Sequence, residues 1–302
     1  MNSKHNYDVI VVGGSYAGLS AAMALGRSLR NVLILDSGLP CNRQTPHSHN
    51  FLTQDGITPA KIASVAKEQV LQYKTVQFKN DLALSGAKAS TGFVINTEEG
   101  HSYFAKKLVF ATGIKDIMAP IDGFSECWGI SVIHCPYCHG YEVKDNITGI
   151  LANGEFAYHY AQLVNNLTKK LTIFTNGKAE FTAEQTDKLE QHQIPVIETP
   201  VKSLRHKNGY IEQIIFRDDS TFAVNALYAR PIFEQHCKIP ELLGCEVNEM
   251  GLFNTNGFQK TNIEGIYVCG DNCNPMRSVA NAVASGNLVG AMINRELISE
   301  TF

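Results

Sequence analysis

The sequence predicts an α/β fold in two lobes, with the second lobe inserted into the first. Three observations support this fold class. A strand, a glycine turn and a helix follow one another over residues 7–25, and a similar order recurs over residues 147–167. Two further apolar runs, residues 108–113 and 265–271, end in small residues and flank the second unit in sequence. Strands that alternate with helices are typical of a parallel sheet covered by helices.

The first glycine turn has the features of a dinucleotide-binding motif. The apolar run 7–12 is rich in β-branched residues and predicts a buried strand, and residues 19–25 are good helix-forming sequence. A turn between them exposes backbone N–H groups and directs the positive end of a helix at a pyrophosphate. Ser15 stands where the middle glycine normally lies, and its small side chain still permits close approach. The predicted contacts are Gly13, Gly14, Ser15, Ala17 and Gly18.

A carboxylate follows at the distance expected for ribose binding. The apolar run 32–35 ends at Asp36, which is 23 positions after Gly13. A carboxylate that binds the ribose hydroxyls lies ~20 residues after such a turn. An aspartate here could also be a helix cap or a solvated turn residue, but the spacing favours nucleotide binding. We expect Ser37 and Leu82 among the cofactor contacts as well.

Two later segments favour FAD as the cofactor. Residues 108–113 end in Ala111, Thr112 and Gly113, and residues 265–271 end in Gly270 and Asp271. These pieces resemble those of two-dinucleotide-binding flavoproteins. The resemblance implies that the Ala-Thr-Gly turn lies beside the cofactor and that the Asp271 carboxylate binds the ribityl chain of FAD.

A helix of small residues follows the second segment. It is expected to begin near Ser278 and Val279 and to run to about Ile298. Its positive N-terminus would face the N1/O2 edge of the flavin, where negative charge collects on reduction. A simpler interpretation is that this is a core helix that packs on the sheet. The helix can both pack on the sheet and face the flavin.

A polar loop over residues 41–50 is expected to cover the cofactor, with Arg43 and Asn50 as predicted contacts. His47 and His49 are interpreted as ordinary loop residues, because no carboxylate or cysteine completes a site at metal-ligand spacing. We therefore expect no metal.

The pattern changes near residues 118–120 and again near 243–246, which suggests the boundaries of an insertion. The fold class then becomes two Rossmann-like, three-layer ββα dinucleotide-binding domains. Residues 1–116 and 246–302 form the FAD-binding domain, and residues 117–245 form an NAD(P)-binding-like domain. Hinges are expected near Pro120 and Gly244.

The insert carries a pair of cysteines, Cys135 and Cys138, separated by two residues. Such a pair can close and reopen a small disulfide as a two-electron switch. Its thiolate form is favoured near a helix N-terminus or a cationic neighbour. His134 and His139 flank the pair, and either could hold or deliver a proton near neutral pH.

With its cysteine pair in the insert, the whole chain resembles the low-molecular-weight thioredoxin reductases. The resemblance implies that Cys138 lies against the flavin and that Cys135 exchanges with substrate. It also implies a homodimer and a thioredoxin-like protein partner. The family usually has aspartate as proton donor where this chain has His139, our candidate acid/base. A Cys-x-x-Cys-His variant also resembles the dithiol oxidases that close disulfides in small natural products.

The second glycine turn departs from the family pattern. Ala152 occupies the first glycine position, where a side chain crowds the turn. The arginines that bind the 2′-phosphate of NADPH are missing, and Lys178 alone offers a point charge rather than a bidentate fork. A weak nicotinamide-nucleotide site would comprise Asn153, Gly154, Glu155 and Lys178. Three possibilities stay open: the inserted domain binds NADPH, it binds NADH, or it is a scaffold that binds neither nucleotide.

Other interpretations of the cysteine pair fit the sequence less well. A c-type haem attachment would need export, a zinc site would need further ligands, and a glutaredoxin would lack the flavin lobe. Cys269 precedes Asp271 in the flavin lobe. Cys41, Cys127, Cys237 and Cys245 show no pairing pattern and are expected to be buried thiols.

Composition limits the partners. The net charge is −3 and no window is dense in Lys or Arg, so there is no electrostatic case for nucleic acid or for an anionic membrane. The first apolar run, residues 9–12, is too short for a signal peptide or a spanning helix. A cytoplasmic location is therefore expected, where a cysteine pair is more often catalytic than a structural staple.

The sequence thus predicts an FAD-dependent thiol–disulfide oxidoreductase, thioredoxin reductase-like, that moves electrons between the flavin, Cys135–Cys138 and an external disulfide or dithiol. Three alternatives stay open: an oxidase that closes a small-molecule dithiol with oxygen, a ferredoxin-fed reductase with a degenerate NADPH site, and a non-enzymatic flavin redox sensor.

Overall fold

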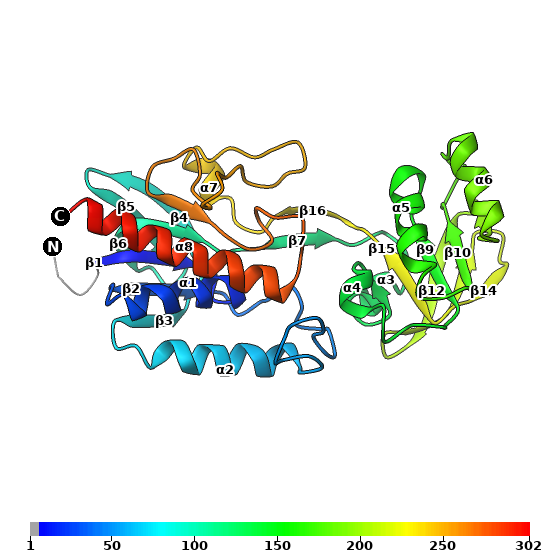
Figure 1. Cartoon of the computed structure of the whole chain (residues 1–302), viewed down its shortest axis with the longest axis horizontal. Coiled ribbons are helices and arrows are strands. Elements are labelled where there is room, and N and C mark those ends of the chain that lie inside the picture. Colours follow the sequence, from blue (N-terminus) through cyan, green and yellow to red (C-terminus); the bar gives the residue numbers. More distant parts are fainter. Residues whose placement is uncertain (1–5) are drawn as a thin grey trace. The chain divides into compact units, whose positions relative to one another are not determined.

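The computed structural model describes residues 6–302, which divide into two compact units (Figure 1). Unit 1 comprises residues 6–43, Phe51–Lys115 and Phe233–Phe302. Unit 2 comprises Gln44–Asn50 and Asp116–Ile232. Each unit has its own sheets and its own hydrophobic clusters.

Unit 1 is built on a parallel sheet in the order β3-β2-β1-β6, with β17 also pairing with β6. These strands carry nearly continuous apolar runs because both faces of the sheet are covered. Their bounds are β1 Asn6–Val12, β2 Val32–Asp36, β3 Val76–Asn80, β6 Ser102–Phe110 and β17 Ile266–Val268.

Helices cover one face of this sheet, and a β-hairpin with a short helix packs into the cluster on the other. The helices are α1 (Tyr16–Arg27), α2 (Pro59–Leu71) and α8 (Val279–Ser299). The second cluster involves β4 (Ala83–Ala89), β5 (Gly92–Thr97) and α7 (Ile239–Leu242). Strands β4, β5 and the start of β6 pair antiparallel, which gives a ββα arrangement of three layers.

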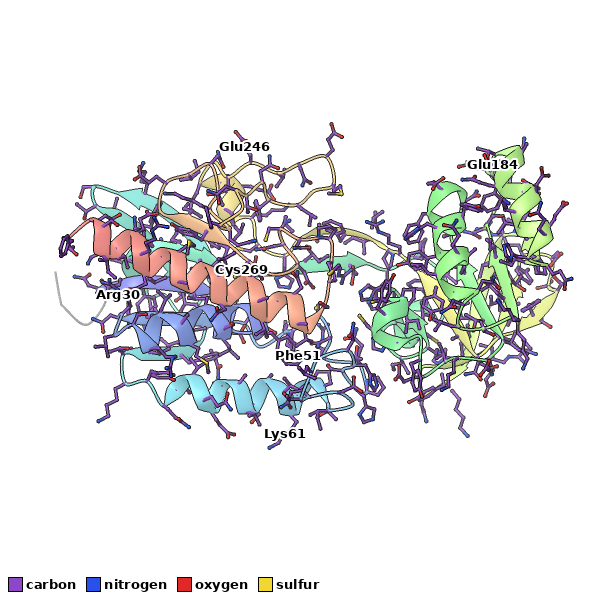
Figure 2. All side chains as sticks on the ribbon, in the orientation of Figure 1. Arg30, Phe51, Lys61, Glu184, Glu246 and Cys269 are labelled. Carbon is purple, nitrogen blue, oxygen red and sulfur yellow. The ribbon has the colours of Figure 1, made fainter. Side chains whose placement is uncertain are left out.

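Helices α1 and α8 lie unusually close together. A Cβ atom on Gly286 would lie 2.0 Å from the carbonyl oxygen of Ala17, so only glycine permits this approach. Arg30, after α1, donates from Nε to Asn294 Oδ1 of α8 at 2.7 Å, and Cys269 is buried beneath the same helix pair (Figure 2). This contact fixes α8 against the strand ends of unit 1.

Unit 2 repeats the three layers. Its sheet is parallel, in the order β11-β10-β9-β15-β8, with helices on one face and an antiparallel three-stranded sheet on the other. The parallel strands are β8 Val132–Ile133, β9 Thr148–Leu151, β10 Leu171–Phe174, β11 Val196–Ile197 and β15 Ala226–Ala229. The antiparallel strands are β12 Val201–Lys207, β13 Tyr210–Phe216 and β14 Thr221–Ala223. The helices are α3 Phe124–Cys127, α4 Pro136–His139, α5 Gly154–Val164 and α6 Ala183–Gln191.

The chain passes between the units through two paired strands, β7 (Ile114–Ile117) and β16 (Ile232–Gln235). This division groups residues 233–245 with unit 1, whereas the sequence assigned them to the inserted domain. Ile239 and Cys245 pack in the cluster behind the unit 1 sheet, which explains the grouping. Loop residues 44–50 group with unit 2 instead.

The predicted α/β class with two dinucleotide-binding folds is confirmed. Two details differ. The sequence predicts a turn over residues 152–157 and a helix only from Tyr158 to Leu167, whereas α5 already begins at Gly154, because the Asn153 side chain caps Gly154 N. Cys41 is exposed in a polar turn, so its predicted burial is wrong; Cys127 and Cys245 are buried and Cys237 is half-buried. Among residues 6–302 no helix is long and apolar enough to cross a membrane.

Candidate active site

The first glycine turn is held against the ends of neighbouring strands. Gly13 donates to the Leu35 carbonyl at 2.8 Å and has a φ of +103°. A Cβ atom on Gly13 would lie 2.3 Å from the Ala111 carbonyl oxygen, and one on Gly18 would lie 1.8 Å from the Gly13 carbonyl oxygen. Only glycine therefore fits either position, because neighbouring backbone occupies the space that a side chain would need.

Ser15 is the N-cap residue of α1, followed by the buried Ala17 in the first turn of the helix. The Ser15 side chain makes no capping hydrogen bond. A helix N-terminus left without a side-chain cap keeps its first N–H groups and its positive dipole end for an anion. The residues of the predicted pyrophosphate cradle thus lie at an uncapped helix N-terminus, and their contact with a dinucleotide stays a prediction.

Asp36 organises the edge of this turn from the end of β2. Its Oδ1 accepts from Gly14 N at 2.9 Å and its Oδ2 accepts from Gly38 N at 3.2 Å. The neighbouring Ser37 is exposed. The carboxylate is thus fixed beside the glycine turn, where a ribose-binding carboxylate belongs.

Two further strand ends meet the turn. Ala111 N donates to the Val12 carbonyl at 2.8 Å, which places Ala111, Thr112 and Gly113 beside the end of β1. Gly270 has a φ of +83° and donates to Ser285 Oγ at 3.1 Å, so the end of β17 is tied to α8. The carboxyl ends of parallel strands thus converge at one edge, where ligands bind in such sheets.

Asn272 was missed by sequence reasoning. Its side chain is fully buried and donates from Nδ2 to the Phe110 carbonyl at 2.8 Å, with Thr112 Oγ1 at 3.4 Å. It therefore joins the ends of β6 and β17 beneath the predicted cofactor contacts. Its position next to Asp271 was the available sequence signal.

The start of α8 lies beside Asp271. Arg277 Nε is 3.8 Å from Asp271 Oδ2, an ion pair that the sequence did not predict. Ser278 Oγ accepts from Asn281 N at 3.1 Å and caps the helix, which then begins at Val279 as expected.

The three other predicted cofactor contacts, Arg43, Asn50 and Leu82, have side chains that are exposed to solvent. Arg43 is exposed and donates to the Pro40 carbonyl at 3.1 Å. Asn50 is exposed and belongs to unit 2. Leu82 is partly exposed and follows Asp81, whose N–H donates to the Asp36 carbonyl at 3.0 Å.

The cysteine pair spans a single helical turn of unit 2. Cys135 is the N-cap of α4, Pro136 is its first residue, and Cys135 Sγ accepts from Cys138 N at 3.2 Å. Both cysteines are half-buried and Tyr137 between them is exposed. An N–H group directed at the first sulfur stabilises negative charge there, so Cys135 is suited to act as the nucleophilic thiolate.

His139 has an electrostatic setting that the sequence only partly indicated. Burial lowers the pKa of the His139 imidazole. The charge of Glu142 raises this pKa, and His49 lowers it further. The His49 and His139 rings are 6.4 Å apart at 88°, and His49 Nδ1 lies 3.5 Å from Glu142 Oε1. A neutral imidazole beside the cysteines can accept a thiol proton near neutral pH.

Two tyrosines pack beneath the motif. Tyr160 donates its hydroxyl to the His134 carbonyl, and its ring lies 6.1 Å from that of Tyr228. Tyr228 is fully buried, and its hydroxyl makes no hydrogen bond within residues 6–302. Burial, followed by Cys135, raises the pKa of Tyr228, so this phenol is neutral at physiological pH.

The side chain of Asn153 fills the second glycine turn. Asn153 Oδ1 accepts from Gly154 N and from Glu180 N, each at 2.9 Å, and its Nδ2 donates to the Lys178 carbonyl at 2.8 Å. Glu155 accepts from Gln185 at 2.6 Å, and Lys178 itself is exposed. One N–H group of this turn, that of Gly154, is therefore already bonded to a side chain, and the Glu155 and Glu180 carboxylates lie close by.

Comparison with known proteins decides the family. The model described as pyridine nucleotide-disulphide oxidoreductase matches residues 7–286. The chain belongs to the pyridine nucleotide-disulphide oxidoreductase family. Membership makes it an enzyme, a flavin-dependent disulfide oxidoreductase, and implies use of a flavin and a pyridine nucleotide.

Relatives within this family confirm the resemblance to thioredoxin reductases. A putative thioredoxin reductase TrxB from Bacillus anthracis has a TM-score of 0.93 at 31% identity, covering 98% of this chain and 100% of that one. An oxidoreductase from Agrobacterium tumefaciens has a TM-score of 0.91 at 34% identity, covering 97% and 99%. Thioredoxin reductase tcpT from Claviceps purpurea is 28% identical over 99% of this chain and 97% of its own length.

Proposed function

We propose that the chain is an FAD-dependent thiol–disulfide oxidoreductase that uses Cys135 and Cys138 as its exchanging pair. The observation that carries the proposal is the hydrogen bond from Cys138 N to Cys135 Sγ, which prepares one sulfur of the pair as a nucleophile. The glycine turn of unit 1 fits FAD, because the close backbone contacts of Gly13 and Gly18 hold the uncapped start of α1, whose N–H groups can meet a pyrophosphate. Asp36 and Asp271 are then the carboxylates that hold its ribose and ribityl hydroxyls.

Cys135, Cys138 and His139 carry out the exchange with a substrate disulfide. The Cys135 thiolate attacks one sulfur of a substrate disulfide, which forms a mixed disulfide and releases the first substrate thiol. The Cys138 thiolate then attacks Cys135 Sγ, which closes the Cys135–Cys138 disulfide and releases the second thiol. His139 accepts the proton of the attacking thiol and returns it to the leaving sulfur. A flavin held by unit 1 would supply, when reduced, the electron pair that reopens this disulfide, and when oxidised it would accept that pair in the opposite direction.

An anaerobic titration tests this function. The purified holoprotein is titrated with a dithiol while the visible absorbance of the flavin is followed. We expect the wild type to be reduced and the Cys135→Ser and Cys138→Ser variants to be reduced at least about 100-fold more slowly. A chain that binds no flavin, or variants reduced at the wild-type rate, would contradict the proposal.

A second candidate function is favoured by the filled turn at Asn153. An oxidase that closes a small-molecule dithiol would need no nicotinamide nucleotide. The substrate loses two electrons and two protons as its S–S bond forms, and dioxygen takes them up to give hydrogen peroxide. Rapid aerobic turnover of dithiols, with peroxide formed in equal amount and no flavin reduction by NADPH or NADH, would support this function. Rapid reduction by either nucleotide at micromolar concentration would support the reductase instead.

The proposed partner and assembly rest on the resemblance to thioredoxin reductases, and the proposed location rests on the sequence. The physiological partner is a thioredoxin-like protein or a small-molecule disulfide or dithiol, the assembly is a homodimer, and the location is cytoplasmic. Sedimentation of the holoprotein tests the dimer. Competition between a thioredoxin and a small dithiol for the same oxidised enzyme tests the substrate class.

A further inference from the structure

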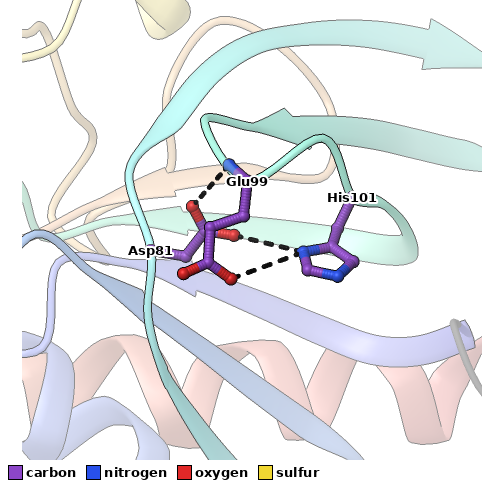
Figure 3. Close-up of side chains that lie close together, drawn as sticks. All are labelled: Asp81, Glu99 and His101. Atoms are coloured by element: carbon purple, nitrogen blue, oxygen red, sulfur yellow. Dashed lines mark hydrogen bonds and ion pairs between the residues drawn. The ribbon is translucent and has the colours of Figure 1, made fainter.

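Two turns of unit 1 bring three potential metal ligands together (Figure 3). Asp81 follows β3, Glu99 lies in the turn between β5 and β6, and His101 directly precedes β6. His101 Nδ1 lies 3.5 Å from Asp81 Oδ2 and 3.8 Å from Glu99 Oε2. One donor atom from each residue lies within 4.8 Å of the others.

Asp81 has an unused oxygen inside this cluster. Its side chain is only 2% exposed, and Oδ1 accepts from Glu99 N at 3.3 Å. Within the described part of the chain, neither Asp81 Oδ2 nor His101 Nδ1 makes a hydrogen bond. A buried carboxylate oxygen without a hydrogen bond is costly, so one directed at two other donor groups indicates a missing ligand.

The charge of the cluster suits a divalent cation. Glu99 N already donates to Asp81 Oδ1, which leaves Asp81 Oδ2 facing His101 Nδ1 at 3.5 Å. Asp81 and Glu99 are thus two carboxylates facing one imidazole. Separations of 3.5 and 3.8 Å are long for hydrogen bonds. They approach the roughly 3.4 Å between two ligands that each bind one ion at about 2.1 Å.

We propose that Asp81, Glu99 and His101 bind a divalent transition-metal ion through two carboxylates and one imidazole. Zinc is a suitable probe for such nitrogen and oxygen donors. Glu99 and His101 are partly exposed, so water completes the coordination. The ion ties the turn after β3 to the turn before β6. The site also adjoins Asp36, whose carbonyl accepts from Asp81 N at 3.0 Å.

The Lys79 ammonium group is a second cation that could neutralise this cluster in place of a metal ion. Lys79 Nζ lies 5.6 Å from the centre of the Tyr103 ring, and the His101 ring lies 5.8 Å from that same ring. If Lys79 supplies part of the balancing charge, it competes with a metal ion for Glu99. Replacing it in Lys79→Met is therefore expected to tighten metal binding several-fold, whereas a purely structural cluster would lose stability and gain no affinity.

The experiment uses the full-length chain carrying Cys135→Ser and Cys138→Ser, so that these thiols take up no zinc. After removal of metal by a chelator, Zn²⁺ is titrated by calorimetry and thermal unfolding is followed in parallel. We expect one Zn²⁺ per chain and a rise in Tm. His101→Gln and Glu99→Gln are each expected to weaken binding at least tenfold, because each removes one of three donors.

Glu98→Gln is the matched control, since Glu98 is an exposed neighbour on the same turn and is not among the three donors. It should bind Zn²⁺ as the parent chain does. Asp81→Asn risks unfolding, so the conclusion depends on the two exposed donors. The proposal is overturned if no saturable uptake occurs, or if His101→Gln, Glu99→Gln and Glu98→Gln bind alike.

Discussion

His49 Nδ1 lies 3.5 Å from Glu142 Oε1, which connects a loop near the start of the chain to the turn that follows the cysteine pair. The same two residues act on the His139 imidazole in opposite directions. Glu142 raises the pKa of His139, while His49 lowers it. Burial is the largest cause of the lowered pKa of His139, and these two residues outside the motif adjust that pKa in opposite directions.

Removing either neighbour should therefore move the His139 pKa in a defined direction. In Glu142→Gln the stabilising negative charge is lost, so we expect a lower pKa and an acid limb of the pH–rate profile at lower pH. In His49→Gln we expect the reverse shift. NMR titration of the His139 ring protons measures both directly. Identical shifts in the two variants would show that neither residue acts through its charge.

The cysteine pair should be selectively required for thiol exchange. Cys135→Ser or Cys138→Ser should reduce turnover at least about 100-fold, because each removes one sulfur of the two-step exchange. Cys41→Ser is the control, because Cys41 is exposed and lies in unit 1, away from the pair in sequence. It should retain turnover within about twofold. A comparable loss in Cys41→Ser would mean that a different thiol takes part.

The contact between α1 and α8 should be sensitive to one methyl group. Gly286→Ala places a Cβ atom 2.0 Å from the Ala17 carbonyl oxygen. The helices must then separate, with an expected loss of about 1–3 kcal/mol in the free energy of unfolding and weaker FAD retention. Gly257→Ala is matched, since a Cβ atom there meets nothing within 4 Å. Urea unfolding and the flavin content of the purified Gly286→Ala and Gly257→Ala proteins test this prediction. Equal stability of the two variants would refute close packing as the reason for Gly286.

Glu296 should make stability depend on pH in the acid range. Burial opposes its ionisation, but hydrogen bonds from Lys107, Tyr267 and Lys260 outweigh it and lower its pKa to about 2. Because the folded pKa is below the ordinary value near 4.5, this stabilisation is full above about pH 4.5. It is lost as pH falls towards 2.

Glu296→Gln should therefore lower the free energy of unfolding at pH 7 by roughly 2–3 kcal/mol, and this difference should shrink by pH 3. Urea unfolding at the two pH values is the measurement. Glu249→Gln, at an exposed position in the same unit, serves as the control and should change little. A deficit in Glu296→Gln that stays constant with pH would contradict the expected ionisation.

Local signals in the sequence predicted much of the site. Gly13, Asp36 and the Cys135–Cys138 pair each belong to a short motif whose spacing has a direct physical meaning, and the fold follows from strands and helices in alternation. The sequence did not indicate the contact of His49 with Glu142, or the junction at Asn272. These contacts join residues far apart in the chain, and nothing in local spacing encodes them.

The same limit explains the altered boundary of the insert. A change of composition near residue 245 was visible, but the burial of Ile239 against the unit 1 sheet depends on a tertiary contact. Asn153 is an intermediate case. The missing first glycine was apparent, whereas the three hydrogen bonds of its amide required coordinates.

Those three hydrogen bonds tie the loop after β10 to the first residue of α5 through one side chain. A dinucleotide that bound at this turn would compete with the Asn153 amide for Gly154 N. The rate at which a pyridine nucleotide delivers electrons to this enzyme is then expected to depend on how readily the Asn153 side chain rotates away.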